Sequence, residues 1–136
     1  MLKVKKSRAF TLVEVMIVVG VISLLAAIAI PNLISMKRTA NEASAKANIR
    51  SLASAAETAS VSLGRYPANV GELQNFISSA PSYCADLTGT QSAVQGYNYS
   101  CTMDATGYSF VANPVTLGTT GSITYTATTG GILTPL

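Results

Sequence analysis

A single apolar stretch constrains the folding of this chain more than any other feature. Residues 10–30 form a run of 21 residues in which Glu14 is the only charged side chain. Because an α-helix rises about 1.5 Å per residue, a helix of this length matches the ~30 Å hydrocarbon core of a bilayer. We therefore expect this run to form a helix that crosses a membrane.

The distribution of charge gives this helix an orientation. Four of the nine basic residues lie within the first nine positions of the 136-residue chain. The positive-inside bias keeps that end in the cytoplasm and directs the chain after residue 30 outward. The rest of the sequence has five basic and six acidic side chains. This balance argues against nucleic-acid binding through general basicity, and we predict no specific nucleic-acid partner.

A cleavable secretory signal peptide is the main alternative for this N-terminus. A basic region followed by an apolar run is also the layout of such a peptide. Here, however, the apolar run is long, and Pro31 and Asn32 follow it directly where small residues would mark a cleavage site. Helix-forming sequence then resumes, so we favour a membrane helix that the mature protein retains.

Glu14 is the most informative residue of the apolar run. A carboxylate at the bilayer centre costs about 2.5 to 3.5 kcal/mol on insertion scales, and such groups usually have a partner. One interpretation places Glu14 near the interface, where water still solvates it. The other gives it a positive partner from outside the helix or from a newly made chain terminus, because the run itself holds no basic residue.

Residues 8–33, RAFTLVEVMIVVGVISLLAAIAIPNL, resemble the N-terminal signature of type IV pilins and of the related pseudopilins of type II secretion. The resemblance implies that a prepilin peptidase removes a leader, residues 1–9, by cutting between Ala9 and Phe10, and that Phe10 is then N-methylated. It also implies that Glu14 meets the N-terminal amine of a neighbouring subunit during assembly. The family usually has Gly before the cut. Ala9 is also small, so we expect ordinary or slower processing.

The same resemblance implies partners and a location. The partners are copies of the chain itself in a helical filament, the prepilin peptidase, and an inner-membrane assembly platform with its ATPase. The precursor would lie in the bacterial inner membrane with its N-terminus in the cytoplasm and its C-terminal domain in the periplasm. The assembled subunit would belong to an extracellular pilus or a periplasmic pseudopilus.

A long helix is expected to continue beyond the membrane run. Pro31 leaves the carbonyl of Ala27 without its intrahelical bond, which predicts a kink rather than the end of the helix. We assign residues 10–36 to the hydrophobic membrane and assembly helix, and residues 37–63 to an amphipathic half that ends before Gly64. Its apolar stripe follows helical spacing through Ala45, Ile49, Leu52, Ala56, Ala59 and Leu63.

Residues 37–136 are predicted to form one globular domain. A connecting region over residues 64–93 should contain a short helix near 70–79, because Asn69 and Glu72 have the spacing of a capping box. Alternating apolar residues then predict antiparallel strands within residues 94–136. The expected fold class is α+β and pilin-like, with one long N-terminal helix packed on a small sheet of three or four strands.

The two cysteines, Cys84 and Cys101, are predicted to form a disulfide, because a chain that faces outward lies in an oxidising compartment. Metal binding needs more ligands than two Cys in a chain without His, and a catalytic Cys would lack its His. We therefore predict no metal site, no cofactor and no enzymatic activity.

Three functions remain open. The first is a structural subunit of a type IV pilus-like filament, with a role in attachment, surface motility or DNA uptake. The second is a pseudopilin that supports protein export by type II secretion. The third is a membrane-anchored binding domain. Major pseudopilins typically bind calcium through acidic ligands near the C-terminus, and this chain has no carboxylate side chain after Asp104, which favours the first function.

Overall fold

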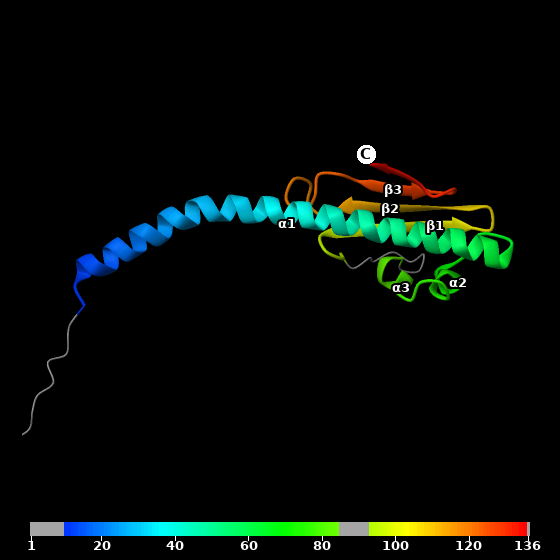
Figure 1. Cartoon of the computed structure of the whole chain (residues 1–136), viewed down its shortest axis with the longest axis horizontal. Coiled ribbons are helices and arrows are strands. Elements are labelled where there is room, and N and C mark those ends of the chain that lie inside the picture. The colour runs from blue at the N-terminus through cyan, green and yellow to red at the C-terminus, as the bar shows by residue number, and fades with distance from the viewer. Residues whose placement is uncertain (1–9, 85–92, 136) are drawn as a thin grey trace, which may run out of the picture. The chain divides into compact units, whose positions relative to one another are not determined.

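The structure, a computed structural model, describes residues 10–84 and 93–135 (Figure 1). The chain divides into two compact units, one that ends at Ile34 and one that runs from Ser35 to Leu136. The helix α1, Leu12–Leu63, contributes residues to both. The predicted leader, residues 1–9, lies outside the described residues, and this includes Ala9.

In the first unit, α1 begins at Leu12 and includes Pro31 within the helix. The helix therefore continues through the proline, as the sequence predicted. A proline removes one backbone donor but leaves the remaining hydrogen bonds of a helix available. The kink at Pro31 stays a prediction.

In the second unit, one face of α1 is buried. The buried residues include all members of the predicted stripe except Leu63, which is 45% exposed in the last turn. Ala53 and Ala55 are also buried, so the stripe is wider than the sequence spacing indicated. Gly64 follows the helix with a φ of 70°, a left-handed conformation that glycine adopts without steric cost and that ends helices.

The connecting region differs from the prediction of one helix near 70–79. It contains two short helices, α2 at Val70–Gln74 and α3 at Ala80–Tyr83. The amides of both Phe76 and Ile77 donate to the carbonyl of Leu73, which closes a turn after α2. Asn and Ser side chains compete for backbone hydrogen bonds and favour turns, and Asn75 with Ser78 and Ser79 supplies such residues here.

Four strands follow and form one sheet. They are β1 at Tyr97–Asp104, β2 at Gly107–Pro114, β3 at Tyr125–Thr128 and β4 at Ile132–Pro135. Their order in the sheet is β1-β2-β3-β4, and every neighbouring pair is antiparallel. The predicted meander and the pilin-like α+β fold class are confirmed.

The sheet packs its aromatic side chains into the core with α1. The register pairs Cys101 with Phe110 and Phe110 with Ala127, so this row of residues lies on one face across three strands. Phe110 is fully buried, as is Ile49 of α1. The aromatic residues of the alternating pattern are therefore core residues, and the second unit has the single hydrophobic core that a domain of this size needs.

Candidate processing and assembly site

The residues that the sequence assigns to processing lie at the start of α1. Phe10 is 79% exposed and precedes the first helical residue, Leu12. Phe10 and Thr11 lie outside regular secondary structure, which is the kind of backbone that proteases cleave. Ala9 lies outside the described residues, so the structure describes only the Phe10 side of the predicted cut.

Glu14 has a partner within its own helix. Both the amide and the hydroxyl of Thr11 donate hydrogen bonds to Glu14 Oε2, at 3.0 and 2.9 Å. The Glu14 amide donates in turn to Thr11 Oγ1 at 3.3 Å. This reciprocal arrangement is a capping box, which satisfies donors that the first turn of a helix leaves free. Only one carboxylate oxygen is used by the described residues.

The sequence analysis missed Thr11 as a partner of Glu14. The spacing Thr-x-x-Glu before an apolar run is itself the capping-box signature. The same spacing was recognised at Asn69 and Glu72, so the signal was present in the sequence. Glu14 thus combines a local role, in which it fixes the start of α1, with a second oxygen that is open to a further donor.

The first unit has a continuous apolar surface. Its large hydrophobic side chains are exposed throughout, and the helix is long and apolar enough to cross a membrane by length and composition. Gly20 has no atom within 4 Å of the position where a Cβ would lie, so the helix surface is open there. Exposed apolar patches of this size mark contact with a membrane or another protein chain.

In the second unit, two carboxylates of α1 bond to the sheet and to the loops that connect its strands. Glu42 Oε1 accepts hydrogen bonds from the amide and the hydroxyl of Ser122, at 2.8 and 2.7 Å. Glu57 Oε1 accepts one from the Tyr108 hydroxyl at 2.9 Å and one from the Gly130 amide at 2.8 Å. These bonds join α1 to the loop before β3, to β2 and to the turn before β4.

The electrostatics of these sites follow from the same contacts. The hydrogen bond from the Ser122 side chain lowers the pKa of Glu42, because it stabilises the ionised form. Burial raises the pKa of Tyr108 well above its usual range, and the hydrogen bond to Glu57 acts in the same direction. At neutral pH, Glu42 is therefore ionised and accepts its hydrogen bonds, while Tyr108 keeps the proton that it donates to Glu57.

Arg65 and Glu72 form an ion pair in the connecting region. The guanidinium donates to both carboxylate oxygens, at 2.9 and 2.8 Å, and the Ala68 amide donates to Glu72 Oε2 at 3.0 Å. The Arg65 hydrogen bonds lower the pKa of Glu72 to about 2. Asn69 accepts from the Glu72 amide at 2.9 Å and confirms the predicted N-cap of α2.

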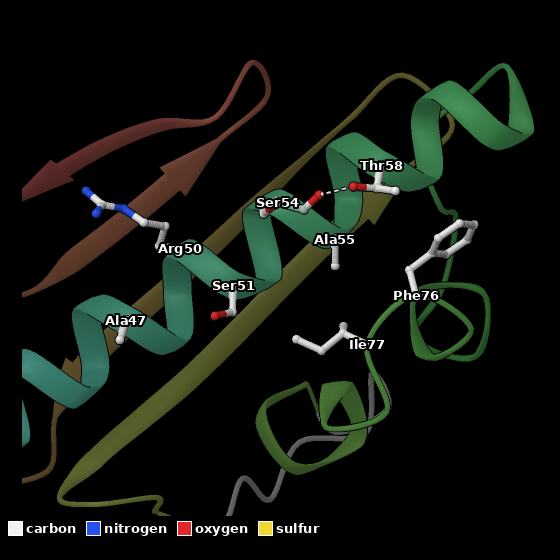
Figure 2. Close-up of a pocket in the computed structure, with 8 residues that line it drawn as sticks. All are labelled: Ala47, Arg50, Ser51, Ser54, Ala55, Thr58, Phe76 and Ile77. Atoms are coloured by element: carbon white, nitrogen blue, oxygen red, sulfur yellow. Dashed lines mark hydrogen bonds between the residues drawn. The ribbon is translucent and has the colours of Figure 1, made fainter.

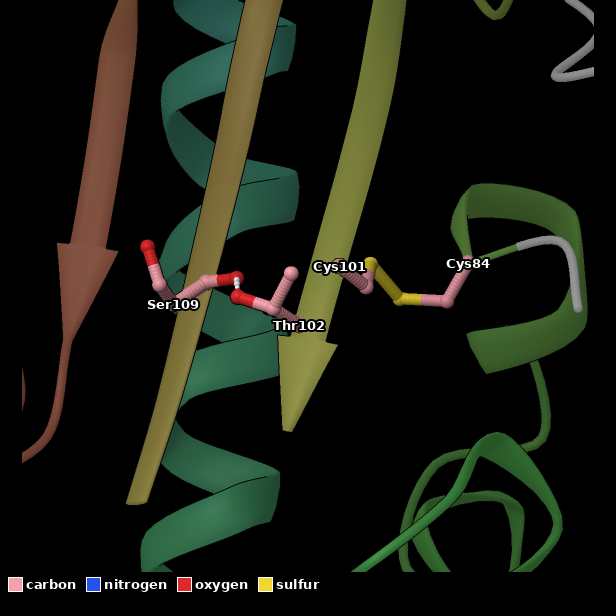
Figure 3. Close-up of a disulfide and its surroundings, with 4 residues drawn as sticks. All are labelled: Cys84, Cys101, Thr102 and Ser109. Atoms are coloured by element: carbon pink, nitrogen blue, oxygen red, sulfur yellow. Dashed lines mark hydrogen bonds between the residues drawn. A yellow bond between two sulfur atoms is a disulfide. The ribbon is translucent and has the colours of Figure 1, made fainter. Parts of the chain in front are cut away.

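The predicted disulfide is present. Cys84, at the end of α3, is bonded to Cys101 of β1, and their Cα atoms are 5.3 Å apart (Figure 3). On the next residue of β1, the Thr102 hydroxyl donates to the carbonyl of Ser109 on β2 at 3.2 Å (Figure 3). The disulfide thus fixes the connecting region to the first strand of the sheet.

A groove of about 570 Å³ lies between α1 and the turn that follows α2 (Figure 2). Small side chains of α1 form most of one wall, while Phe76 and Ile77 line the other. The Thr58 hydroxyl donates to the carbonyl of Ser54 at 2.8 Å, so it is engaged in the helix (Figure 2). Arg50 is the one charged side chain among the described residues that line the groove.

The described residues contain no group of three or more His, Cys, Asp and Glu side chains that could hold a metal ion. Glu14 and Pro31 lie in the N-terminal half of α1, and Phe10 precedes its first residue, Leu12. The two cysteines lie in the second unit. The structure thus separates the apolar surface from the residues that stabilise the globular fold.

A long N-terminal helix whose second half packs on a four-stranded antiparallel sheet defines a pilin-like protein. The family model that describes the prokaryotic N-terminal methylation motif matches residues 4–30. That range includes the predicted cut and most of the apolar run.

Two curated proteins are similar to a little more than half of the chain. The type IV major pilin protein PilA of Myxococcus xanthus strain DK1622 is 40% identical over 76 residues, which cover 56% of this chain and 33% of PilA. The type II secretion system core protein G of Pectobacterium carotovorum subsp. carotovorum is 33% identical over 72 residues, which cover 53% of this chain and 46% of that protein. The chain thus spans less than half the length of these relatives.

The chain carries the N-terminal methylation motif and is homologous to type IV pilins and type II secretion pseudopilins. Proteins of this class are structural rather than enzymatic, in agreement with the sequence prediction.

Proposed function

We propose that the chain is a subunit of a type IV pilus-like filament. The prepilin peptidase cuts between Ala9 and Phe10, removes the leader, residues 1–9, and leaves Phe10 as the N-methylated terminus. Residues 10–36 then serve first as a membrane anchor and later as the assembly helix. Residues 37–136 form the globular domain, which the orientation of the helix places in the periplasm before assembly.

The exposed apolar surface of the first unit carries this proposal. From Phe10 to Met36 the large hydrophobic side chains of the helix are exposed, although burial of such side chains is worth about 1.5 to 3 kcal/mol each. A bilayer covers this surface in the unassembled subunit, and copies of the same helix cover it in a filament. Small residues such as Gly20 allow neighbouring helices to approach closely.

Glu14 gives the assembly its register. The described residues leave Glu14 Oε1 without a donor, while Thr11 occupies Oε2. We assign the N-terminal amine of the neighbouring subunit's Phe10 as the donor to Oε1. An ion pair in an apolar environment is much stronger than in water, and a misplaced subunit would leave the carboxylate unpaired. The cut before Phe10 creates the amine, so processing and assembly are coupled.

The proposed partners are copies of this chain, the prepilin peptidase, and an inner-membrane assembly platform driven by an ATPase. The proposed roles of the filament are attachment, surface motility or DNA uptake. The identity to a type IV major pilin, 40% over 76 residues, supports a pilus over other filaments.

The alternative is a pseudopilin of a type II secretion system, which would form a short periplasmic filament for protein export. The similarity to core protein G, 33% identical over 72 residues, favours this function. This sequence has no carboxylate side chain after Asp104, which weighs against the calcium site that major pseudopilins typically contain.

Electron microscopy of the cell surface with and without this gene separates the two functions. We expect long filaments on the wild-type cells and their loss on deletion, with return on complementation. Filaments that persist while export of folded proteins fails would instead identify a pseudopilin.

A variant of Glu14 tests the assembly mechanism. Glu14→Ala should remain in the inner membrane yet lose filament yield by about tenfold, which corresponds to about 1.4 kcal/mol of assembly free energy. Ser23→Ala is the matched control, because the Ser23 hydroxyl only bonds the carbonyl of Val19 in its own helix. Normal filament yield from Glu14→Ala would contradict the pairing.

A further inference from the structure

We propose that the loop between β2 and β3 rests on the phospholipid surface while the subunit is anchored in the membrane. Val115 and Leu117 would enter the headgroup layer, and Lys37 would bind lipid phosphates. This inference rests on the membrane anchoring in the proposed function. It adds a second lipid contact that belongs to the globular unit rather than to the membrane helix.

The loop exposes two apolar side chains that do not pack into the core of the domain. Leu117 is 75% exposed and Val115 is 48% exposed. The residues between and after them, Thr116, Gly118 and Thr119, are uncharged. Uncharged segments with protruding apolar side chains can enter a membrane interface without the cost of burying a charge.

The loop holds its shape through its own hydrogen bonds. The Thr116 carbonyl accepts bonds from the amides of Thr119 and Thr120, at 3.1 and 3.0 Å. The Gly118 amide donates to the carbonyl of Gly121 at 2.7 Å. Leu117 is therefore held in solvent by an ordered turn, so no ordering cost opposes its contact with another surface.

The loop is fixed to the part of α1 that follows the apolar run. Asn41 Nδ2 donates to the carbonyl of Thr120 at 3.0 Å, and Glu42 accepts both bonds from Ser122. Asn41 lies five residues after Met36, the last exposed apolar residue of the predicted membrane helix. Five residues span about 7.5 Å of helix, close to the thickness of one headgroup layer.

The charges near the loop suit lipid phosphates. Residues 37–50 of α1 contain four basic side chains and one acidic side chain, Glu42. Glu42 bonds Ser122, and its single negative charge is outweighed by the four basic side chains. Lys37 is exposed and lies directly after Met36. Basic residues beside a membrane helix are attracted to anionic lipid headgroups.

A lipid surface fits this loop better than a second copy of the chain. Stable protein interfaces bury about 800 Å² on each partner, far more than two apolar side chains supply. A contact with the bilayer can be weak, because the helix already holds the domain at the membrane and raises the effective concentration.

The chain contains no Trp, so one introduced Trp reports on one position. We would reconstitute full-length Leu117→Trp in vesicles of phosphatidylethanolamine and phosphatidylglycerol with brominated acyl chains. Val61→Trp is the matched control, because Val61 is 87% exposed and lies twenty residues beyond Asn41 on α1. We expect brominated lipid to quench Leu117→Trp about twofold or more over Val61→Trp, with emission at shorter wavelength.

Flotation of the vesicles tests membrane anchoring separately from the contact between the loop and the lipid. Protein that fails to float with the lipid would contradict membrane anchoring itself. Protein that floats while both variants show equal, weak quenching would overturn the loop contact and leave the anchoring intact. A blue shift that grows with protein density without quenching would assign the loop to a second copy and would also overturn the proposal.

Lys37→Gln in the Leu117→Trp background tests the phosphate contact. We expect this double variant to be quenched less than Leu117→Trp, close to the level of Val61→Trp. Quenching of Leu117→Trp should fall similarly when phosphatidylcholine replaces phosphatidylglycerol. Quenching that is unchanged by both would contradict the role of Lys37.

Discussion

The two halves of α1 share one helical backbone but differ in what covers them. In the first half, the apolar side chains are exposed and the only charged group, Glu14, bonds to its own first turn. In the second half, one face is buried, Glu42 bonds to the loop before β3, and Glu57 bonds to β2. Helix formation alone therefore does not decide burial. The chain supplies the covering surface for one half, and a membrane or other subunits must supply it for the other.

Truncation of a large side chain should separate the two halves most strongly. Phe110 is fully buried, so Phe110→Ala should lower the free energy of unfolding by about 3 to 5 kcal/mol. Val18→Ala, in the exposed half, should change it by less than about 0.5 kcal/mol. Near-UV circular dichroism during urea titration of the detergent-solubilised protein measures both. Equal losses of unfolding free energy in the two variants would contradict the division into an exposed half and a half covered by the sheet.

Removal of the disulfide should have the next largest effect. The Cys84–Cys101 bond closes a loop with a sequence separation of 17 residues. The variant with Cys84→Ala and Cys101→Ala should lose about 3 kcal/mol of stability in the chain-entropy model. The same urea titration measures this loss, and reduction of the wild-type protein is the control. A loss of helicity in the first half would be unexpected.

The two capping boxes allow a smaller and matched comparison. Asn69→Ala should cost about 1 kcal/mol of global stability, because α2 packs the buried Leu73 against the core. Thr11→Val should instead speed amide hydrogen exchange only in the first turn of α1. Exchange measured by NMR in micelles distinguishes local from global loss. A global effect of Thr11→Val would show that the halves are energetically coupled.

The ion pair should give the smallest effect and a defined pH dependence. The pKa of Glu72 lies at about 2, below its ordinary value of 4.5, because Arg65 stabilises the carboxylate. Any stability from this pair is therefore present above pH 4.5 and is lost as the pH falls toward 2. An NMR titration of the Glu72 carboxyl carbon should show this value, and Arg65→Met should raise it toward 4.5. An unchanged pKa in the variant would contradict the pairing.

Much of the fold could be predicted because its patterns are local. The apolar stripe of α1 and the alternation around Phe110 each report which side of one element is buried. Gly64 marked the end of the helix because a left-handed residue is needed there. The disulfide followed from the presence of only two cysteines in a chain that faces outward.

Sequence-based prediction fails where the partner of a side chain is distant in the sequence, or where two local structures are close in free energy. The capping-box spacing predicts one short helix near 70–79, but the Asn and Ser residues after Gln74 favour a turn. Ser122 lies 80 residues after Glu42, and Gly130 lies 73 residues after Glu57, so no spacing in the sequence indicates these bonds. The bond between Thr11 and Glu14 is predictable from the sequence, because the Thr-x-x-Glu spacing of a capping box is local.

Mass spectrometry of the purified filaments tests the central claim most directly. If the exposed half of α1 becomes an assembly helix after processing, the N-terminal peptide should begin at Phe10 and carry one added methyl group. Filaments that contain this chain with its first residue still Met1 would contradict the account.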